Sequence, residues 1–258
     1  MMRRTAAAAL WAIMLAPVGL LLVWACAWRW PWPALWPHEW RVRAWYDLGD
    51  SIGLGAVALR SIGIATAVAF CATVLGLVTS RSIARARRHG ALYVLLHLPF
   101  AMSPVVLGVS LEYVFLRVGI AGHVLGVVCA QGLLAYAYAA TLLSGFWNAR
   151  TLAHADGAAT LGANSLQVWI YVLLPIARPL LVLCLAQTFL ISWFDFAIVL
   201  LIGEARVTTL TTDLYQFVVS GDQRLAAASA LLLLLPPVAA LVAHRHLQNG
   251  APIGAAEV

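Results

Sequence analysis

The sequence has no lysine and little charge of either sign. Its 16 basic residues are all arginine, and charged residues make up only 10% of the 258 positions. Soluble domains carry about 25% charged residues, so this chain has too little charge to cover a surface that faces water. Hydrophobic residues reach 63%, and the mean hydropathy is +0.91. We therefore expect an integral membrane protein.

The same shortages exclude several kinds of chemistry. A phosphate-binding loop of the form G-x-x-x-x-G-K-[S/T] needs a lysine, so the chain is not expected to be an ATPase or another enzyme by itself. The sequence contains no H-E-x-x-H and no paired C-x-x-C, and its four cysteines lie in separate apolar runs. No metal, cofactor or disulfide is predicted. The net charge of +6 indicates membrane orientation and contact with membrane lipid, and no nucleic-acid partner.

Five of six apolar segments are near the roughly 20 residues that a spanning helix needs, and the fifth along the chain is longer and is expected to extend into the cytoplasm. Together they predict an all-α polytopic membrane protein. They are residues 10–27, 61–79, 92–115, 124–146, 172–202 and 225–242. The alternative for the first is a signal peptide cleaved after Ala25-Cys26-Ala27, but its length and the five later segments favour an uncleaved helix. Residues 210–219 are apolar enough for a helix on the outer surface. Residues 1–258 are expected to form one transmembrane domain.

The orientation follows from four arginines directly after the second segment: Arg81, Arg85, Arg87 and Arg88. Short loops rich in arginine beside a span stay in the cytoplasm. With six spans, both termini and the loop at residues 147–171 then also lie in the cytoplasm.

Tryptophans concentrate in the connection at residues 29–49, which contains Trp30, Trp36, Trp40 and Trp45. Two interpretations apply to them. Tryptophan is enriched at membrane interfaces, where its ring meets the lipid headgroups and its N–H finds water. An aromatic cage for a ligand is the alternative. We favour the interfacial belt.

The loop between the fourth and fifth segments contains residues typical of a helix end and of a helix start. Gly162 suits the left-handed residue that ends a helix. Asn164 can cap the next helix, with Gln167 three residues later in capping-box position. Pro175 is expected in the first turns of the following span, where a missing N–H costs least. The sequence thus predicts a helix, a sharp turn and a second helix that enters the membrane.

This loop, residues 153–175, resembles the "EAA" loop of permease subunits of bacterial ABC importers, which is written E-A-A-x-x-x-G-x9-I-x-L-P. The matching positions are Asp156, Gly157, Ala158, Gly162, Val172, Leu174 and Pro175. The spacing from the glycine to the proline agrees in full. Aspartate stands for glutamate, which shortens the acid by one methylene, and glycine stands for alanine, which weakens the helix.

The resemblance implies a type I permease in the bacterial inner membrane that forms the path of a solute. Its partners would be a separate ATP-binding-cassette ATPase subunit, a second permease subunit (related or identical) and an extracytoplasmic solute-binding protein. The loop would dock as a coupling helix in a groove of the ATPase. The residues implied for coupling are Asp156, Gly157, Ala158 and Gly162, with Leu174 and Pro175 at the structural end of the motif.

Two further features bear on a translocation path. Asp195 lies within the fifth predicted span, in a stretch that resembles the S-x-x-D-F segment of permeases for iron, thiamine and polyamines. It is either a path residue or a carboxylate that bonds a neighbouring helix. Pro99 and Pro104 interrupt the third span, as a simple kink or as a break beside a water-filled path. The solute is not identifiable from the sequence.

Two other classes of function compete with an importer permease. A secondary transporter driven by an ion gradient would carry several intramembrane charges and internal repeats, of which we find only Asp195 and no convincing repeat. A membrane scaffold subunit that transports nothing would have no coupling motif.

Overall fold

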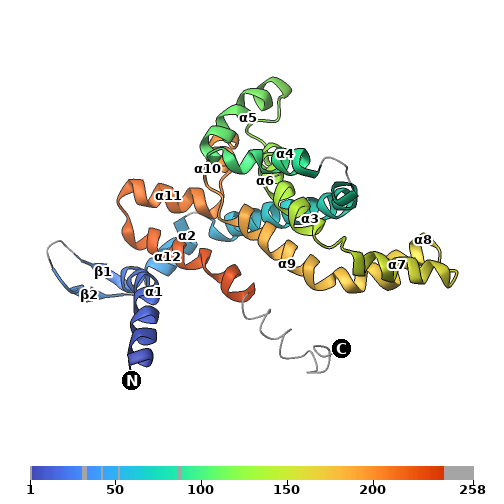
Figure 1. Ribbon diagram of the computed structural model, residues 1–258. Coiled ribbons are helices and arrows are strands. Elements are labelled where there is room, and N and C mark those ends of the chain that lie inside the picture. The colour runs from blue at the N-terminus through green and yellow to red at the C-terminus, as the bar shows by residue number, and fades with distance from the viewer. Residues whose placement is uncertain (1, 31–33, 42, 52, 86–88, 241–258) are drawn as a thin grey trace. The chain divides into compact units, whose positions relative to one another are not determined.

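The computed structural model describes residues 2–30, 34–41, 43–51, 53–85 and 89–240 (Figure 1). Contacts divide the chain into two compact units. We call Met1–Arg60 with Thr208–Val258 the terminal unit, and Ser61–Val207 the central unit.

The terminal unit is built on two helices that pack side by side, α1 (Met2–Cys26) and α12 (Gln223–Leu233). Its core contains Ala25 and Leu48 together with Ala227 and Ala228 of α12. The remaining elements are β1 (Ala27–Arg29), β2 (Glu39–Trp40), α2 (Arg43–Ser51), the first turns of α3 (Leu54–Arg85) and α11 (Leu210–Ser220).

Two features of the terminal unit bear on the sequence predictions. The helix expected at residues 210–219 is confirmed as α11. The sequence analysis predicted no strand in or beside the connection at residues 29–49, but β1 and β2 pair in antiparallel fashion, with Ala27 opposite Trp40. A pairing this short and local leaves no alternating apolar pattern from which to predict it.

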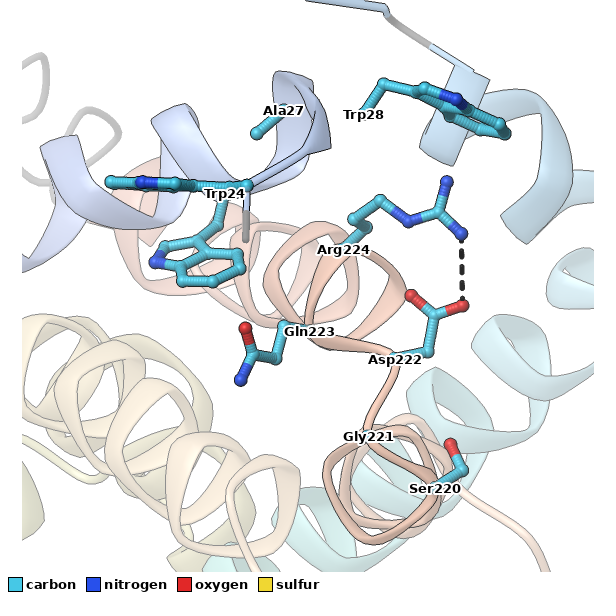
Figure 2. Close-up of a pocket in the computed structure, with 9 residues that line it drawn as sticks. Trp24, Ala27, Trp28, Ser220, Gly221, Asp222, Gln223 and Arg224 are labelled. Carbon is cyan, nitrogen blue, oxygen red and sulfur yellow. Dashed lines mark hydrogen bonds and ion pairs between the residues drawn. The ribbon is translucent and has the colours of Figure 1, made fainter. Parts of the chain in front are cut away.

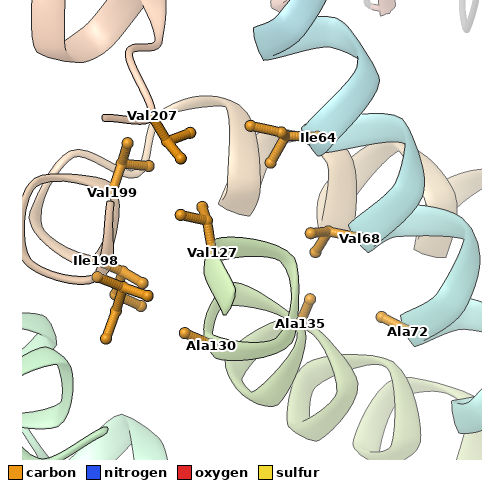
Figure 3. Close-up of a cluster of buried hydrophobic side chains, with 10 residues drawn as sticks. Ile64, Val68, Ala72, Val127, Ala130, Ala135, Ile198, Val199 and Val207 are labelled. Atoms are coloured by element: carbon orange, nitrogen blue, oxygen red, sulfur yellow. The ribbon is translucent and has the colours of Figure 1, made fainter. Parts of the chain in front are cut away.

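The central unit contains the rest of α3 and a series of helices of very different lengths. They are α4 (His89–Ala101), α5 (Pro104–Val118), α6 (Val124–Ser144), α7 (Ala149–Thr160), α8 (Ser165–Gln167), the π-helix η1 (Val168–Leu173), α9 (Leu174–Trp193) and α10 (Ala197–Ile202). Side chains of three helices form its main core (Figure 3). They include Val68 of α3, Val127 of α6 and Ile198 of α10.

Small residues let the helices of this unit approach closely. A Cβ added at Gly76 of α3 would lie 2.8 Å from the Cβ of Ala139 on α6. A Cβ added at Gly108 of α5 would lie 2.6 Å from the Cδ1 of Leu201 on α10. Close backbone approach at small residues is typical of helices that associate within a membrane.

Among the residues that the structure describes, four helices are long and apolar enough to cross a membrane: Leu54–Arg85, Val124–Ser144, Ser165–Trp193 and Gln223–Ala240. The bent pair Gly90–Ala101 and Pro104–Val118 raises the number to five if it is counted as one span. The apolar part of α1, Leu10–Cys26, is shorter than these four helices and falls below the 18 residues of a candidate span. The chain is thus an all-α, multi-pass membrane protein, and the number of six spans stays a prediction. The predicted end of the last span and the His244–His246 tail lie outside the described residues.

The third predicted span, residues 92–115, is not a single kinked helix. It consists of α4 and α5, which meet at an angle of 97°. Ser103 adopts an extended backbone before Pro104, and Pro104 opens α5. Proline disfavours the helical conformation in the residue before it and is well placed in a first turn, where its N–H is not needed. Pro99, in contrast, lies inside α4.

The fifth predicted span, residues 172–202, is also wrong as a single rod. The helix begins at Ser165 and ends at Trp193, and α10 follows separately after a break. Pro175 is the second residue of α9, in its first turn as predicted. The wider turn of η1 precedes it, where the N–H of Leu174 donates to the carbonyl oxygen of Trp169, five residues back. A π-turn of this kind lets the helix continue past a residue that has no N–H to donate.

Candidate functional site

The helix α7 begins and ends with its backbone groups satisfied. At its start, the side-chain oxygen of Asn148 accepts a hydrogen bond from the N–H of Thr151 at 2.9 Å. At its end, the N–H of Gly162 donates to Ala159 at 3.0 Å and the N–H of Ala163 donates to Ala158 at 3.2 Å. This pair of bonds forms a Schellman motif. The φ of Gly162 is +88°, so the predicted left-handed stop is confirmed.

The turn after α7 leads directly into a capped second helix. The N–H of Gln167 donates to the Asn164 side chain, and the N–H of Asn164 donates to the Gln167 side chain, both at 2.9 Å. The predicted capping box is therefore confirmed. Since the backbone of the turn is satisfied within the loop, the outward-facing side chains are not needed to hold its shape.

The base of the loop is attached to α3 through Trp147, a residue that the sequence analysis did not single out. Its side chain is only 8% exposed, and its Nε1 donates to the Oγ of Ser80 at 2.8 Å. The guanidinium of Arg81 lies 5.3 Å from the centre of the ring, within the distance of a cation–π interaction. The only sequence signal was a large aromatic residue directly before the motif. The loop is thus fixed to α3 as well as to α9.

The residues implied for coupling do not all face outward. Asp156, Gly157 and Gly162 are exposed, as are Leu174 and Pro175. Ala158 instead packs, half-buried, against a core cluster that contains Trp147, Val168 and Leu173. Its small side chain therefore serves the packing of the loop on its own chain.

The outermost side chains of the loop are large and apolar. Leu161, directly before Gly162, is 90% exposed, Leu166 is 68% exposed and Tyr171 is 75% exposed. None was singled out from the sequence, because nothing in the motif distinguishes an apolar residue at a tip from one in a core. Large apolar side chains that stand exposed on a loop are suited to contact with a partner. We call Leu161, Leu166 and Tyr171 the loop tip.

Asp195 lies in the break between α9 and α10, and its carboxylate is held by hydrogen bonds. The Nε2 of Gln131 on α6 donates to its Oδ2 at 3.0 Å, and the Oγ of Ser192 donates to the Oε1 of Gln131 at 2.6 Å. The backbone N–H groups of Ile198 and Val199 also bond to the carboxylate, so it caps α10. These contacts favour the alternative in which Asp195 bonds a neighbouring helix.

Of the residues proposed for a path, Pro99 lies at an apolar pocket of about 470 Å³ between α3, α4, α5 and α6. Leu95, Leu107 and Leu133 also line it, whereas Pro104 and Asp195 do not. A translocation path through these three residues stays a prediction.

Among the residues that the structure describes, no group of three or more His, Cys, Asp or Glu side chains could hold a metal ion. No protein-family model matches the sequence, and no curated protein matches it either.

Proposed function

We propose that this chain is a membrane subunit through which a solute crosses the membrane, driven by a partner protein that binds at the loop of residues 149–175. More specifically, we infer a permease subunit of a bacterial ABC importer. The observation that carries this proposal is the loop tip: large apolar side chains stand exposed on a loop whose own backbone is already closed by caps at both turns. This fits a surface that a partner covers.

In this proposal α7 and the loop tip dock in a groove of a separate ATPase subunit. Burial of a leucine side chain contributes about 1.5–3 kcal/mol, so Leu161 and Leu166 would supply much of the contact energy. The exposed carboxylate of Asp156 accepts hydrogen bonds from donors on the ATPase. A small residue at position 157, glycine here and alanine in the motif, lets the partner approach α7 closely.

Movement at the loop reaches the membrane helices by two routes. The helix Ser165–Trp193 is continuous through η1 and Pro175, so it carries a displacement of the loop along its length. Trp147 carries the same displacement to α3 through Ser80 and Arg81. The loop would thus move α3 and α9 together rather than α9 alone.

The remaining partners follow from this arrangement. An importer contacts two ATPase subunits, and one chain has one such loop, so a second permease subunit, related or identical, completes the complex. An extracytoplasmic solute-binding protein delivers the solute, and the complex lies in the bacterial inner membrane. In the proposal Asp195 positions α10 rather than touching the solute.

The proposal is tested by isolating the affinity-tagged full-length chain from its native membrane and identifying the proteins that accompany it. We expect a subunit with a phosphate-binding loop among these proteins. When the complex is placed in lipid nanodiscs, we expect the solute-loaded binding protein to stimulate its ATP hydrolysis. Solute uptake that persists without ATP and stops when an ion gradient is removed would instead favour a secondary transporter. Isolation without any nucleotide-binding partner would favour a scaffold subunit.

A further inference from the structure

Three tryptophans that are close in the sequence gather at one pocket of the terminal unit. The pocket has a volume of about 380 Å³ and lies where α1 ends and α12 begins (Figure 2). Trp24, Trp28 and Trp30 line it, together with Asp222, Gln223 and Arg224 among others. Small-molecule sites have volumes of roughly 300–1,000 Å³, so this pocket can hold a group of several heavy atoms.

The pocket carries one charge of each sign, side by side. The guanidinium of Arg224 lies 3.4 Å from the Oδ2 of Asp222 and 4.5 Å from the ring centre of Trp28. Figure 2 shows this guanidinium between the carboxylate and the indole ring. Arginine has five N–H donors, and a single contact to Asp222 leaves others for a second acceptor. A ligand that matches the pocket therefore carries an anionic and a cationic group close together.

Aromatic faces add a preference for the cationic group. The rings of Trp24 and Trp30 lie with their centres 4.8 Å apart at an interplanar angle of 31°. An ammonium group is attracted to the face of a tryptophan ring, and Asp222 supplies the matching negative charge. Arg224 in turn suits a phosphate, which accepts hydrogen bonds from a guanidinium.

The approach to the pocket is apolar. Large apolar side chains of α1 stand exposed along the helix that leads to Trp24: Leu10, Trp11, Ile13, Met14, Leu15, Leu20 and Leu22. In a membrane protein such a surface faces lipid chains. Tryptophan rings are concentrated where the chains end and the headgroups begin. The pocket is therefore placed to receive the headgroup of a lipid whose chains run along α1.

We propose that this pocket binds the zwitterionic headgroup of a phosphatidylethanolamine-type phospholipid. Arg224 binds the phosphate, and Asp222 holds the ammonium group against a ring face that the packed Trp24–Trp30 pair leaves uncovered. The site does not depend on the transport function proposed above, since it requires only that α1 lies in a membrane.

The test measures lipid binding to the full-length chain, purified in detergent together with the subunits that accompany it. Dioleoyl phosphatidylethanolamine and dioleoyl phosphatidylglycerol are titrated in equal amounts, and bound lipid is counted by native mass spectrometry. The wild-type chain is expected to retain phosphatidylethanolamine preferentially. Arg224→Gln is expected to weaken this binding about tenfold, because it removes charge-assisted hydrogen bonds. Asp222→Asn is expected to remove the preference over phosphatidylglycerol.

The matched control is Arg206→Gln, an equal change of charge at an exposed arginine outside the pocket, which is expected to leave lipid binding unchanged. Lack of a preference for phosphatidylethanolamine in the wild-type chain would overturn the proposal whether or not the variants fold. Binding of soluble glycerophosphoethanolamine as tight as that of the lipid would also overturn it, because the chains would then contribute nothing. The variant Arg224→Gln can also leave lipid binding unchanged and weaken the binding of an extracytoplasmic protein. That result would overturn the proposal and assign the pocket to the protein.

Discussion

Two helices of the central unit are interrupted, and the two interruptions solve the same problem in opposite ways. After α7 the chain turns at Gly162, and backbone groups bond to backbone groups across the turn. After α9 the chain breaks at Asp195, and a side chain bonds the first N–H groups of α10. Both arrangements satisfy groups that a helix end would otherwise leave unpaired.

The side chains around the two interruptions differ accordingly. Around Asp195 the polar side chains point inward, and Gln131 is only 1% exposed. Around Gly162 they are exposed, and the most exposed large residue is the apolar Leu161. An enclosed polar network holds a fold together, whereas an exposed apolar tip is suited to a partner. The comparison thus separates a break held by an enclosed network from a turn whose exposed side chains suit the docking proposed above.

The strongest test of this comparison is Gly162→Pro. Proline fixes φ near −65°, whereas Gly162 has a φ of +88° and its N–H donates to Ala159. We expect solute-stimulated ATP hydrolysis by the assembled complex to fall to the unstimulated rate, while membrane insertion stays intact. Gly162→Asn is the control, because asparagine tolerates a left-handed conformation, and it is expected to keep most of the stimulation. Transport that survives Gly162→Pro would show that the coupling assignment is wrong.

The next largest effect is expected from Gln131→Leu. This change removes one donor to the Asp195 carboxylate and the side-chain acceptor of the buried Ser192 hydroxyl. We expect the protein to be destabilised by about 2–3 kcal/mol, measured by thermal unfolding of the purified chain.

The matched variant at the other interruption is Gln167→Leu. It breaks only the exposed capping box and is expected to cost about 1 kcal/mol or less. If the two variants lowered stability equally, the contrast between an enclosed and an exposed interruption would not hold.

A smaller effect is expected from Leu161→Ala. Because this side chain is 90% exposed, the stability of the isolated chain should not change. We expect affinity for the ATPase subunit to fall about tenfold, since apolar area is lost from the contact. Binding of the purified ATPase subunit to the chain in nanodiscs measures this. Leu125→Ala removes an exposed leucine of α6 and serves as the control; an equal loss in both variants would exclude a specific role for Leu161.

The smallest effect is expected from Gly157→Ala. A Cβ at this position meets nothing within 4 Å, and alanine is favoured over glycine inside a helix by about 0.8–1.0 kcal/mol. Amide hydrogen exchange in α7 should slow about fourfold. Coupling should be preserved, because the change restores the alanine of the motif. Exchange that does not slow would mean that the helical state of α7 is set by its packing and caps rather than by propensity.

Local features of the sequence predicted the turn of the loop correctly. Gly162, Asn164 and Gln167 act on backbone groups at most a few residues away, so their spacing alone specifies their roles. The predicted rod of residues 172–202 failed for the opposite reason. The break at Asp195 combines a local cap of α10 with a hydrogen bond from Gln131, which lies 64 residues away along the chain, and no local pattern reveals that bond.

The apolar composition and the lack of lysine determined by themselves that this chain is an α-helical membrane protein without a phosphate-binding loop. Hydropathy and backbone caps depend on residues within one short stretch of the chain, so they can be predicted directly from the sequence. Only the tertiary structure decided that Trp147 fixes the loop to α3, that Leu161 stands exposed and that Gln131 of α6 bonds to Asp195. Each of these depends on which distant residues meet in space, and packing alone settles that.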